Sequence, residues 1–447
     1  MKTTLDRVLS IFAPVEAGEG LTVLLLTVNL FLLMTACYII KPVRESLILG
    51  SAGPEVKSYA GAAGALVFLL LVPLYGKIAS RLNRLRLING VTAFFASNLV
   101  VFYGLSRLRV SFGIVFFLWF GLFNLMLVAQ FWAFTNDVYT QEQGKRLFAI
   151  IGIGSSFGAI LGAQVAGWLF TGIGAYAMLL VAAGLLGVCM VLTNCIHRRA
   201  VSGVGSQRSD APIKSEGGFQ LVFKHRYLFL IALLILLSNI VNTTGEFILG
   251  KSVLEHANAA AVLSSNEAAV RQEYIGKFYA DFYFWVNLVG AGLQMFAVSR
   301  MMKYVGVGPT LFFVPMIALG GYTLVSFAPL LGLIRAAKIA ENGTDYSIEN
   351  TARQALFLPT SREEKYTGKT AIDSFFWRAG DALSALIVFV GTSLAFGIRG
   401  FARTNAVLAG AWMCVAALIG WLRTSEGVAE SGEAAPAMNK SASADAA

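Results

Sequence analysis

Three charged residues interrupt the first long apolar stretch of the chain. Residues 21–40 are apolar or neutral and long enough to cross the hydrocarbon core of a bilayer. Lys41, Arg44 and Glu45 follow almost directly, and residues 46–49 then resume the apolar run. Lys41 and Arg44 are three residues apart, so they share one face of a helix. Two interpretations are open: the cations reach outward to the lipid headgroups, or they form the cationic rim of a pathway for an anion.

Polar side chains also recur in a later apolar stretch, residues 226–250. Asn239, Asn242 and Glu246 fall there at helical spacing, so their face points at protein or water rather than at lipid. For Glu246 two roles are open. It is either the partner in a structural ion pair or a carboxylate that couples or gates the passage of a solute.

Ionisable residues enter three further apolar stretches. Arg335 and Lys338 share one of them. Arg378 and Asp381, three residues apart in another, are spaced to neutralise each other. Asp281 lies among aromatic residues in the third. Each such pair is also open to a purely structural interpretation, as a salt bridge that only holds helices together.

The basic residues in these stretches outnumber the acids nearest to them. A surplus of buried cations favours an anionic ligand that completes the charge balance, because an uncompensated charge inside a membrane is costly. We therefore expect a substrate-binding set that consists of Lys41, Arg44, Arg335, Lys338 and Arg378. We expect a coupling or gating set that consists of Glu45, Glu246, Asp281 and Asp381.

The composition indicates the class of protein. Of the 447 residues, 57% are hydrophobic and 13% are charged, whereas soluble domains carry about 25% charged residues. The mean hydropathy is +0.69. The apolar runs are continuous and about twenty residues long, which is typical of transmembrane helices and unlike the short alternating strands of a barrel. We predict an all-α membrane protein with many spans.

The net charge of +10 does not indicate a nucleic-acid partner. The basic residues lie mainly in short loops between apolar stretches, where they encode membrane topology. The four cysteines lie in or at the ends of apolar stretches and show no CxxC or Cys/His spacing. We therefore expect no nucleic-acid binding, no metal site, no cofactor and no disulfide framework.

Twelve transmembrane spans are predicted, in two groups of six. They cover residues 21–49, 57–80, 87–106, 111–136, 146–171, 174–196, 226–250, 275–299, 307–327, 329–346, 370–396 and 403–422. The resulting domains are a cytoplasmic segment 1–20, an N-terminal half 21–196, a cytoplasmic linker 197–225, a C-terminal half 226–422 and a disordered tail 423–447. Lysine and arginine concentrate in the connections after even-numbered spans, which predicts cytoplasmic termini.

Faint internal repeats favour two homologous halves. Residues 80–84 recur as 299–303, and residues 144–145 recur as 368–369, at nearly the same offset along the chain. Residues 76–84 also resemble the Gly-x-x-x-Asp-Arg-x-Gly-Arg loop of the major facilitator superfamily, with serine and asparagine in place of the aspartate and the second glycine.

Glycines recur every four residues in the predicted span 146–171. Gly154, Gly158 and Gly162 share one face, which lets a neighbouring helix approach closely. They do not follow a strand, so they are not a dinucleotide-binding motif.

One motif resembles a known family. Residues 346–359, Tyr-Ser-Ile-Glu-Asn-Thr-Ala-Arg-Gln-Ala-Leu-Phe-Leu-Pro, and residues 368–373, Gly-Lys-Thr-Ala-Ile-Asp, are similar to a pattern of the ATP/ADP antiporter family. These are the nucleotide transporters of plastids and intracellular bacteria, distant relatives of the major facilitator superfamily. The similarity extends loosely over all twelve spans. It implies a major-facilitator-like fold and transport of a nucleotide.

The resemblance also implies roles for single residues. It places the family's first-span basic residue on Arg44, before Glu45, its seventh-span acid on Glu246 and its eleventh-span lysine on Arg378. The fourth-span acid of the family has no equivalent, because residues 119–124 carry nothing ionisable. Arginine stands where the family has lysine, and a guanidinium favours bidentate contacts with phosphate. These departures weigh against strict exchange of ATP for ADP.

We therefore expect a secondary transporter, not an enzyme, that moves a nucleotide or a related phosphorylated anion by alternating access. We expect Arg44 and Arg378 to converge on a central cavity from opposite halves. Two alternatives stay open: a transporter of another organic anion that is coupled to protons through Glu246 or Asp281, and a non-transporting scaffold of the same fold. The expected surroundings are a small anionic solute and a lipid bilayer, for a monomer in a bacterial inner membrane.

Overall fold

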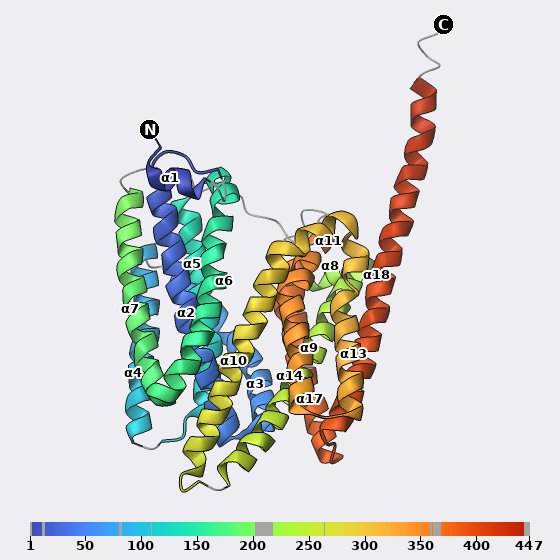
Figure 1. Cartoon of the computed structure of the whole chain (residues 1–447). Coiled ribbons are helices and arrows are strands. Elements are labelled where there is room, and N and C mark those ends of the chain that lie inside the picture. The colour runs from blue at the N-terminus through green and yellow to red at the C-terminus, as the bar shows by residue number, and fades with distance from the viewer. Residues whose placement is uncertain are drawn as a thin grey trace. The chain divides into compact units, whose positions relative to one another are not determined.

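Helices make up the regular structure of the chain (Figure 1). The computed structural model describes residues 2–10, 14–79, 83–108, 110–201, 218–262, 264–357, 360 and 368–441, and these ranges contain helices but no strand. Within them, nine helices are long and apolar enough to cross a membrane, or ten if the bent pair Glu267–Phe296 and Val298–Tyr304 forms one span. The predicted all-α membrane fold is confirmed.

The chain divides into two compact units. The first comprises Met1–Pro212 and Leu249–Leu288, and the second comprises Ile213–Ile248 and Val289–Ala447. The helices up to residue 201 are α1 (Thr4–Leu9), α2 (Gly20–Ser51), α3 (Gly53–Ala79), α4 (Arg84–Arg107), α5 (Gly113–Val138), α6 (Gln141–Gly172) and α7 (Gly174–Val201).

The π-helical segments η1 and η3 accompany the α-helices that follow. These later elements are α8 (Gly218–Lys224), α9 (Arg226–Ala261), α10 (Glu267–Phe296), α11 (Val298–Tyr304), α12 (Val307–Thr310), α13 (Phe313–Phe327), α14 (Leu331–Thr344), η1 (Asp345–Glu349), α15 (Asn350–Leu356), α16 (Lys369–Ala371), η3 (Ile372–Phe376), α17 (Trp377–Ser393) and α18 (Ile398–Ser441). A π-turn adds a residue to the helical repeat and reorients side chains, and such segments are frequent at functional sites.

The boundary between the units differs from the predicted boundary between two halves. Residues 249–288, which are the end of α9 and most of α10, belong to the first unit. Phe170 of α6 lies against Gly276 of α10, and Lys251 Nζ of α9 lies 3.8 Å from Glu55 Oε1 of α3. These are contacts of residues 249–288 within the first unit.

Helix α2 packs against α5, α6 and α7 in the first unit. Its contact with α6 is close, because Gly158 lies directly against the backbone carbonyl of Phe31, where a Cβ would have no room. Gly154 and Gly162, one turn to either side, meet the α2 backbone in the same way. The close packing predicted from this glycine repeat is confirmed.

Two predicted spans coincide with helices outside the nine or ten apolar ones. The predicted span 57–80 corresponds to α3, and the predicted span 329–346 corresponds to α14 and η1. Helix α14 has only 14 residues and contains Arg335, Lys338 and Glu341. It is therefore too short and too charged to resemble a lipid-facing span by composition alone.

Helix α18 extends beyond the predicted last span. It runs from Ile398 to Ser441 and projects past the other helices of the second unit, whereas a disordered tail was predicted from residue 423. Alanine and glutamate, which favour helix formation, are frequent between residues 426 and 437. The expected disorder rested on low apolar content, which does not report local helix propensity.

Candidate functional site

A buried carboxylate on α2 lies between two cations. Glu45 is 0% exposed, Arg44 Nε donates to Glu45 Oε1 at 3.0 Å, and Lys57 Nζ of α3 lies 2.6 Å from Glu45 Oε2. The Tyr283 hydroxyl of α10 donates to the same carboxylate at 3.3 Å. Gly53, with a φ of +84°, forms the turn that returns α3 toward α2, a conformation that favours glycine.

Aromatic rings lie beside the cations of α2. Lys41 Nζ is 4.1 Å from the centroid of the Tyr283 ring. Arg44 Cζ is 5.0 Å from the ring centroids of Phe117 and Phe120 on α5. The electron-rich faces of these rings attract the cations and hold them in place within the membrane. We use the name α2 cluster for Lys41, Arg44 and Glu45 of α2 together with Lys57 of α3.

A second buried network joins α9, α13 and α14 in the second unit. Lys338 is 0% exposed, and its Nζ lies 3.1 Å from Glu341 Oε1 and 3.9 Å from Glu246 Oε1. The Tyr322 hydroxyl donates to Glu341 Oε2 at 2.5 Å. Asn342 Nδ2 donates to Glu246 Oε1 at 3.1 Å. Lys338 therefore interacts with the carboxylates of both Glu341 and Glu246, and the amide of Asn342 orients that of Glu246.

An ion pair on α17 lies in the same unit. Arg378 Nη1 is 3.3 Å from Asp381 Oδ2, so the pairing predicted from their spacing is confirmed. Asn239 Nδ2 of α9 donates to Asp381 Oδ1 at 2.9 Å and to the carbonyl oxygen of Trp377 at 2.6 Å. Gly380 permits this approach, because a Cβ there would meet the Asn239 side chain. The Arg378 side chain is 33% exposed, whereas Asp381 is 15% exposed.

The structure distributes the predicted site residues over both units. Arg44 belongs to the first unit and Arg378 to the second, so their convergence stays a prediction. Arg335 is half-buried on α14, and Asp281 is exposed on α10. The predicted residues with ion-pair or hydrogen-bond partners given above are Arg44, Glu45, Glu246, Lys338, Arg378 and Asp381.

Several members of these groups were outside the predicted site sets, among them Lys57, Tyr283, Tyr322 and Glu341. Lys57 lies at the start of a predicted span. Its position as an ionisable residue at the end of an apolar stretch is the feature of the sequence that could have indicated it. Tyr283 and Tyr322 carry no comparable signal, because a tyrosine fits a helical core, an interface or a hydrogen-bonded site equally well.

The donors of these groups suit oxyanions. Ammonium, guanidinium and amide groups donate hydrogen bonds to phosphate or carboxylate oxygens, and the charged ones do so most strongly. Over the part of the chain that the structure describes, no group of three or more histidine, cysteine, aspartate or glutamate side chains could hold a metal ion.

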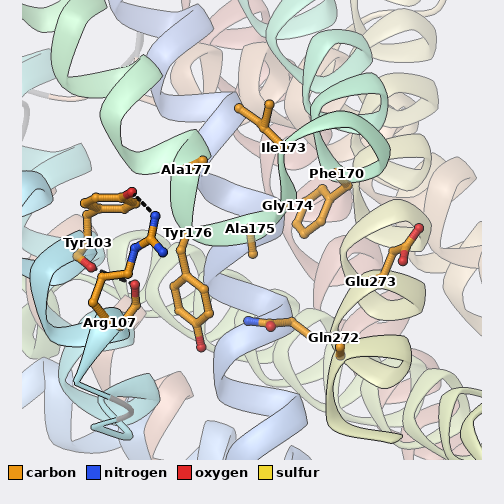
Figure 2. Close-up of a pocket in the computed structure, with 12 residues that line it drawn as sticks. Tyr103, Arg107, Phe170, Ile173, Gly174, Ala175, Tyr176, Ala177, Gln272 and Glu273 are labelled. Carbon is orange, nitrogen blue, oxygen red and sulfur yellow. Dashed lines mark hydrogen bonds between the residues drawn. The ribbon is translucent and has the colours of Figure 1, made fainter. Parts of the chain in front are cut away.

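A cavity of about 480 Å³ lies elsewhere in the first unit, between α4, α10 and the connection from α6 to α7. Arg107 Nη2 donates to the Tyr103 hydroxyl at 2.6 Å, and Tyr176, Gln272 and Glu273 also line the cavity (Figure 2). None of the predicted site residues lines it. The cavity is therefore distinct from the α2 cluster.

No protein-family model matches the chain, but curated proteins are similar to it over most of their length. The ADP,ATP carrier protein 1 of Chlamydia trachomatis serovar D is 22% identical over 456 residues, which cover 84% of this chain and 82% of that protein. The ADP,ATP carrier protein 1 of Chlamydia pneumoniae is 21% identical over 458 residues, which cover 84% and 85%. The resemblance inferred from residues 346–373 is confirmed as a distant one.

Solved transporter structures share the fold. The nucleoside transporter NupG has a TM-score of 0.61 at 13% identity, over 88% of this chain and 98% of that chain. The peptide transporter PepTSo has a TM-score of 0.60 at 12% identity, over 91% and 98%. The chain thus resembles ADP,ATP carrier proteins distantly in sequence and has the major-facilitator-like fold of membrane transporters.

Proposed function

We propose that the protein is a secondary transporter that moves a nucleotide or a related phosphorylated anion by alternating access. The α2 cluster carries this proposal: Arg44 and Lys57 both contact the buried Glu45 carboxylate, and Lys41 lies one helical turn before it. Charge-assisted hydrogen bonds from such cations to phosphate oxygens are about twice as strong as neutral ones. The similarity to ADP,ATP carrier proteins supports the same class of substrate.

Charged residues of the second unit provide further anion binding and the gating of transport. Arg378, the more exposed member of its pair, binds the anion, with Arg335 as a further cation on α14. Glu246 is 20% exposed beside the buried Lys338. It pairs with a cation when the substrate is absent and gives up that cation when the anion binds, so it biases the equilibrium between the empty and the occupied state. A ligand shifts two states only through its differential affinity for them, and competition for the same cations provides that difference. Lys338 was expected in the substrate-binding set, but it is fully buried and held by Glu341, so we propose that it acts in this gating network instead.

We propose the same surroundings for the transporter as the sequence predicted. The bias of lysine and arginine among the loops supports cytoplasmic termini. We propose a bacterial inner membrane as the location and one chain as the working unit. Reporter fusions at residue 210 and after residue 425 should both report the cytoplasm. Opposite compartments for the two fusions would contradict this topology.

Transport into proteoliposomes tests the proposed function. A panel of labelled nucleotides is offered to purified protein in vesicles with and without internal nucleotide. We expect saturable uptake of at least one nucleotide by the wild type and loss of this uptake in Arg44→Gln. The control is Lys277→Gln, at an exposed lysine of the same unit that pairs with Glu273, and its uptake should be normal. Uptake of other organic anions alone would favour the alternative substrate class, and no uptake at all would favour a scaffold.

A further inference from the structure

Glu349, the last residue of η1, is buried without a hydrogen-bond partner. Its exposure is 0%, and neither of its carboxyl oxygens has a hydrogen-bond partner among the residues that the structure describes. An ionised carboxylate in this position loses its hydration without compensation, whereas a protonated carboxyl group costs far less to bury. The surroundings of Glu349 therefore suit a carboxyl group that holds a proton.

Arg353 lies one helical turn beyond Glu349 but is directed to other groups. Its Nη2 donates to Asn350 Oδ1 at 3.4 Å, and its Cζ lies 5.0 Å from the centroid of the Trp377 ring. Its Nε and Nη1 are buried and have no acceptor within the described ranges. Because side chains four residues apart share one face of a helix, two unused donors lie on the same side as an unused carboxyl group.

We propose that Glu349 is a proton-binding site that couples transport to a proton gradient. In one state Glu349 holds its proton and Arg353 lies over Trp377. In the other state the O–H bond of Glu349 has broken, the proton has left to water, and the carboxylate pairs with Arg353. No other bond forms or breaks. The site is distinct from Glu246 and Asp281, and its role in coupling rests on the proposed transport function.

Other charged groups influence the balance between these two states of Glu349. Asp345 of η1 and Arg353 act on Glu349 directly. Helix α13, which also packs against η1, contains no aspartate, glutamate, lysine, arginine or histidine. The charged groups that act on Asp345 or Arg353 in turn are Lys338 on α14 and Asp373 on η3, and Asp373 also faces Lys369 on α16.

Infrared spectroscopy tests proton binding without any substrate. Purified protein in lipid is titrated toward alkaline pH, and the carbonyl stretch of protonated carboxyl groups is followed. We expect a component of this band to disappear on titration in the wild type, to be absent in Glu349→Gln and to persist in Glu255→Gln, a control at an exposed glutamate of α9. Identical spectra for the wild type and Glu349→Gln would overturn the proposal. Glutamine resembles the protonated acid in shape, so we expect this variant to fold.

Proteoliposomes test the coupling. Exchange of labelled ADP across the membrane is compared with net accumulation of ADP under an imposed pH gradient. We expect Glu349→Gln to retain exchange and to lose the response to the gradient, while Glu255→Gln retains both. A gradient response that is unchanged in Glu349→Gln would overturn coupling at this residue. Absence of ADP exchange and accumulation in the wild type would count against nucleotide transport instead, and the infrared result would still decide whether Glu349 binds a proton.

Discussion

Lys57 of α3 lies 2.6 Å from the carboxylate of Glu45 on α2, so residues of two helices complete a buried ion pair in the first unit. The carboxylate is 0% exposed and the Lys57 side chain 11% exposed. Such a pair does not by itself add much stability, because desolvation offsets the attraction. It makes each partner depend on the other, and it fixes the place of Arg44, which contacts the same carboxylate.

Removal of one partner from this pair should therefore be costly. We expect Glu45→Gln to lower the free energy of unfolding by about 3–5 kcal/mol, because two buried cations lose their carboxylate. The cost of Glu45→Gln together with Lys57→Gln should fall well short of the sum of the single costs. Equilibrium unfolding of the four proteins in detergent measures the cycle.

The exposed pair Lys277 and Glu273 provides the control for that cycle. Its Nζ and Oε1 atoms are 2.6 Å apart, but the side chains are 43% and 46% exposed. A cycle there should give a coupling of only about 0.2–1 kcal/mol. Equal couplings for the two pairs would contradict the role assigned to burial around Glu45.

The contact between α2 and α6 predicts a contrast between two glycines of one helix. A Cβ at Gly158 would meet the Phe31 carbonyl, whereas a Cβ at Gly152 would meet nothing within 4 Å. We expect Gly158→Ala to cost about 1–3 kcal/mol of stability. Gly152→Ala should be neutral or stabilise the protein by up to about 1 kcal/mol, because alanine favours a helix more than glycine. Thermal unfolding measures both, and equal Tm values would contradict the close packing.

Glu246 should affect turnover more than binding. Its Oε1 accepts a hydrogen bond from Asn342 and lies 3.9 Å from Lys338 Nζ. Glu246→Gln keeps an acceptor for Asn342 but removes the charge, so we expect nucleotide binding to be retained and exchange to slow. Binding and exchange are measured on the same purified variant, with Glu255→Gln as the control. A lower yield of folded protein with an unchanged rate per molecule would show that Glu246 is only structural.

The N-terminal segment should loosen at acid pH. The Asp6 carboxylate accepts hydrogen bonds from the backbone N–H of Thr3 at 2.8 Å and of Gly20 at 3.0 Å. These bonds, that from Thr3 first, lower the pKa of Asp6 below its ordinary value. Because the folded pKa lies below the unfolded one, the stabilisation is present above about pH 3.9 and is lost as the pH falls through the folded pKa.

Amide exchange at Gly20 measures this loss. We expect the protection factor of the Gly20 amide to fall on acidification below about pH 4, and Asp6→Asn to show weak protection at every pH. Wild-type protection that stays constant on acidification would contradict the role of the Asp6 carboxylate.

The sequence predicted those features that depend on one helix at a time. Continuous apolar runs predict helices, and the glycine repeat of α6 predicts a close neighbour, because both follow from helical periodicity. The pair of Arg378 and Asp381 was predictable for the same reason, since its partners are three residues apart. Glu45 was predicted to lie within a helix beside Arg44, and it does.

Features that depend on packing between helices were not predictable. The partnership of Lys57 with Glu45 requires the turn at Gly53, and that of Tyr322 with Glu341 requires α13 to lie against α14. The π-helices also escaped prediction, because no residue pattern marks the extra residue of a π-turn. Glu349 therefore had no assigned role, although it lies in the motif that resembles the antiporter family.

Equilibrium binding tests most directly whether the α2 cluster binds phosphorylated anions. Labelled ATP and ADP are bound to the purified protein in lipid nanodiscs, for the wild type, Arg44→Gln and the control Lys277→Gln. A hydrogen bond to a charged group is worth about 1.5–3 kcal/mol, so we predict that Arg44→Gln weakens binding by about 10-fold to 100-fold, with Lys277→Gln unchanged. Saturable binding with the same Kd in all three proteins would contradict the assignment of the α2 cluster as the nucleotide site.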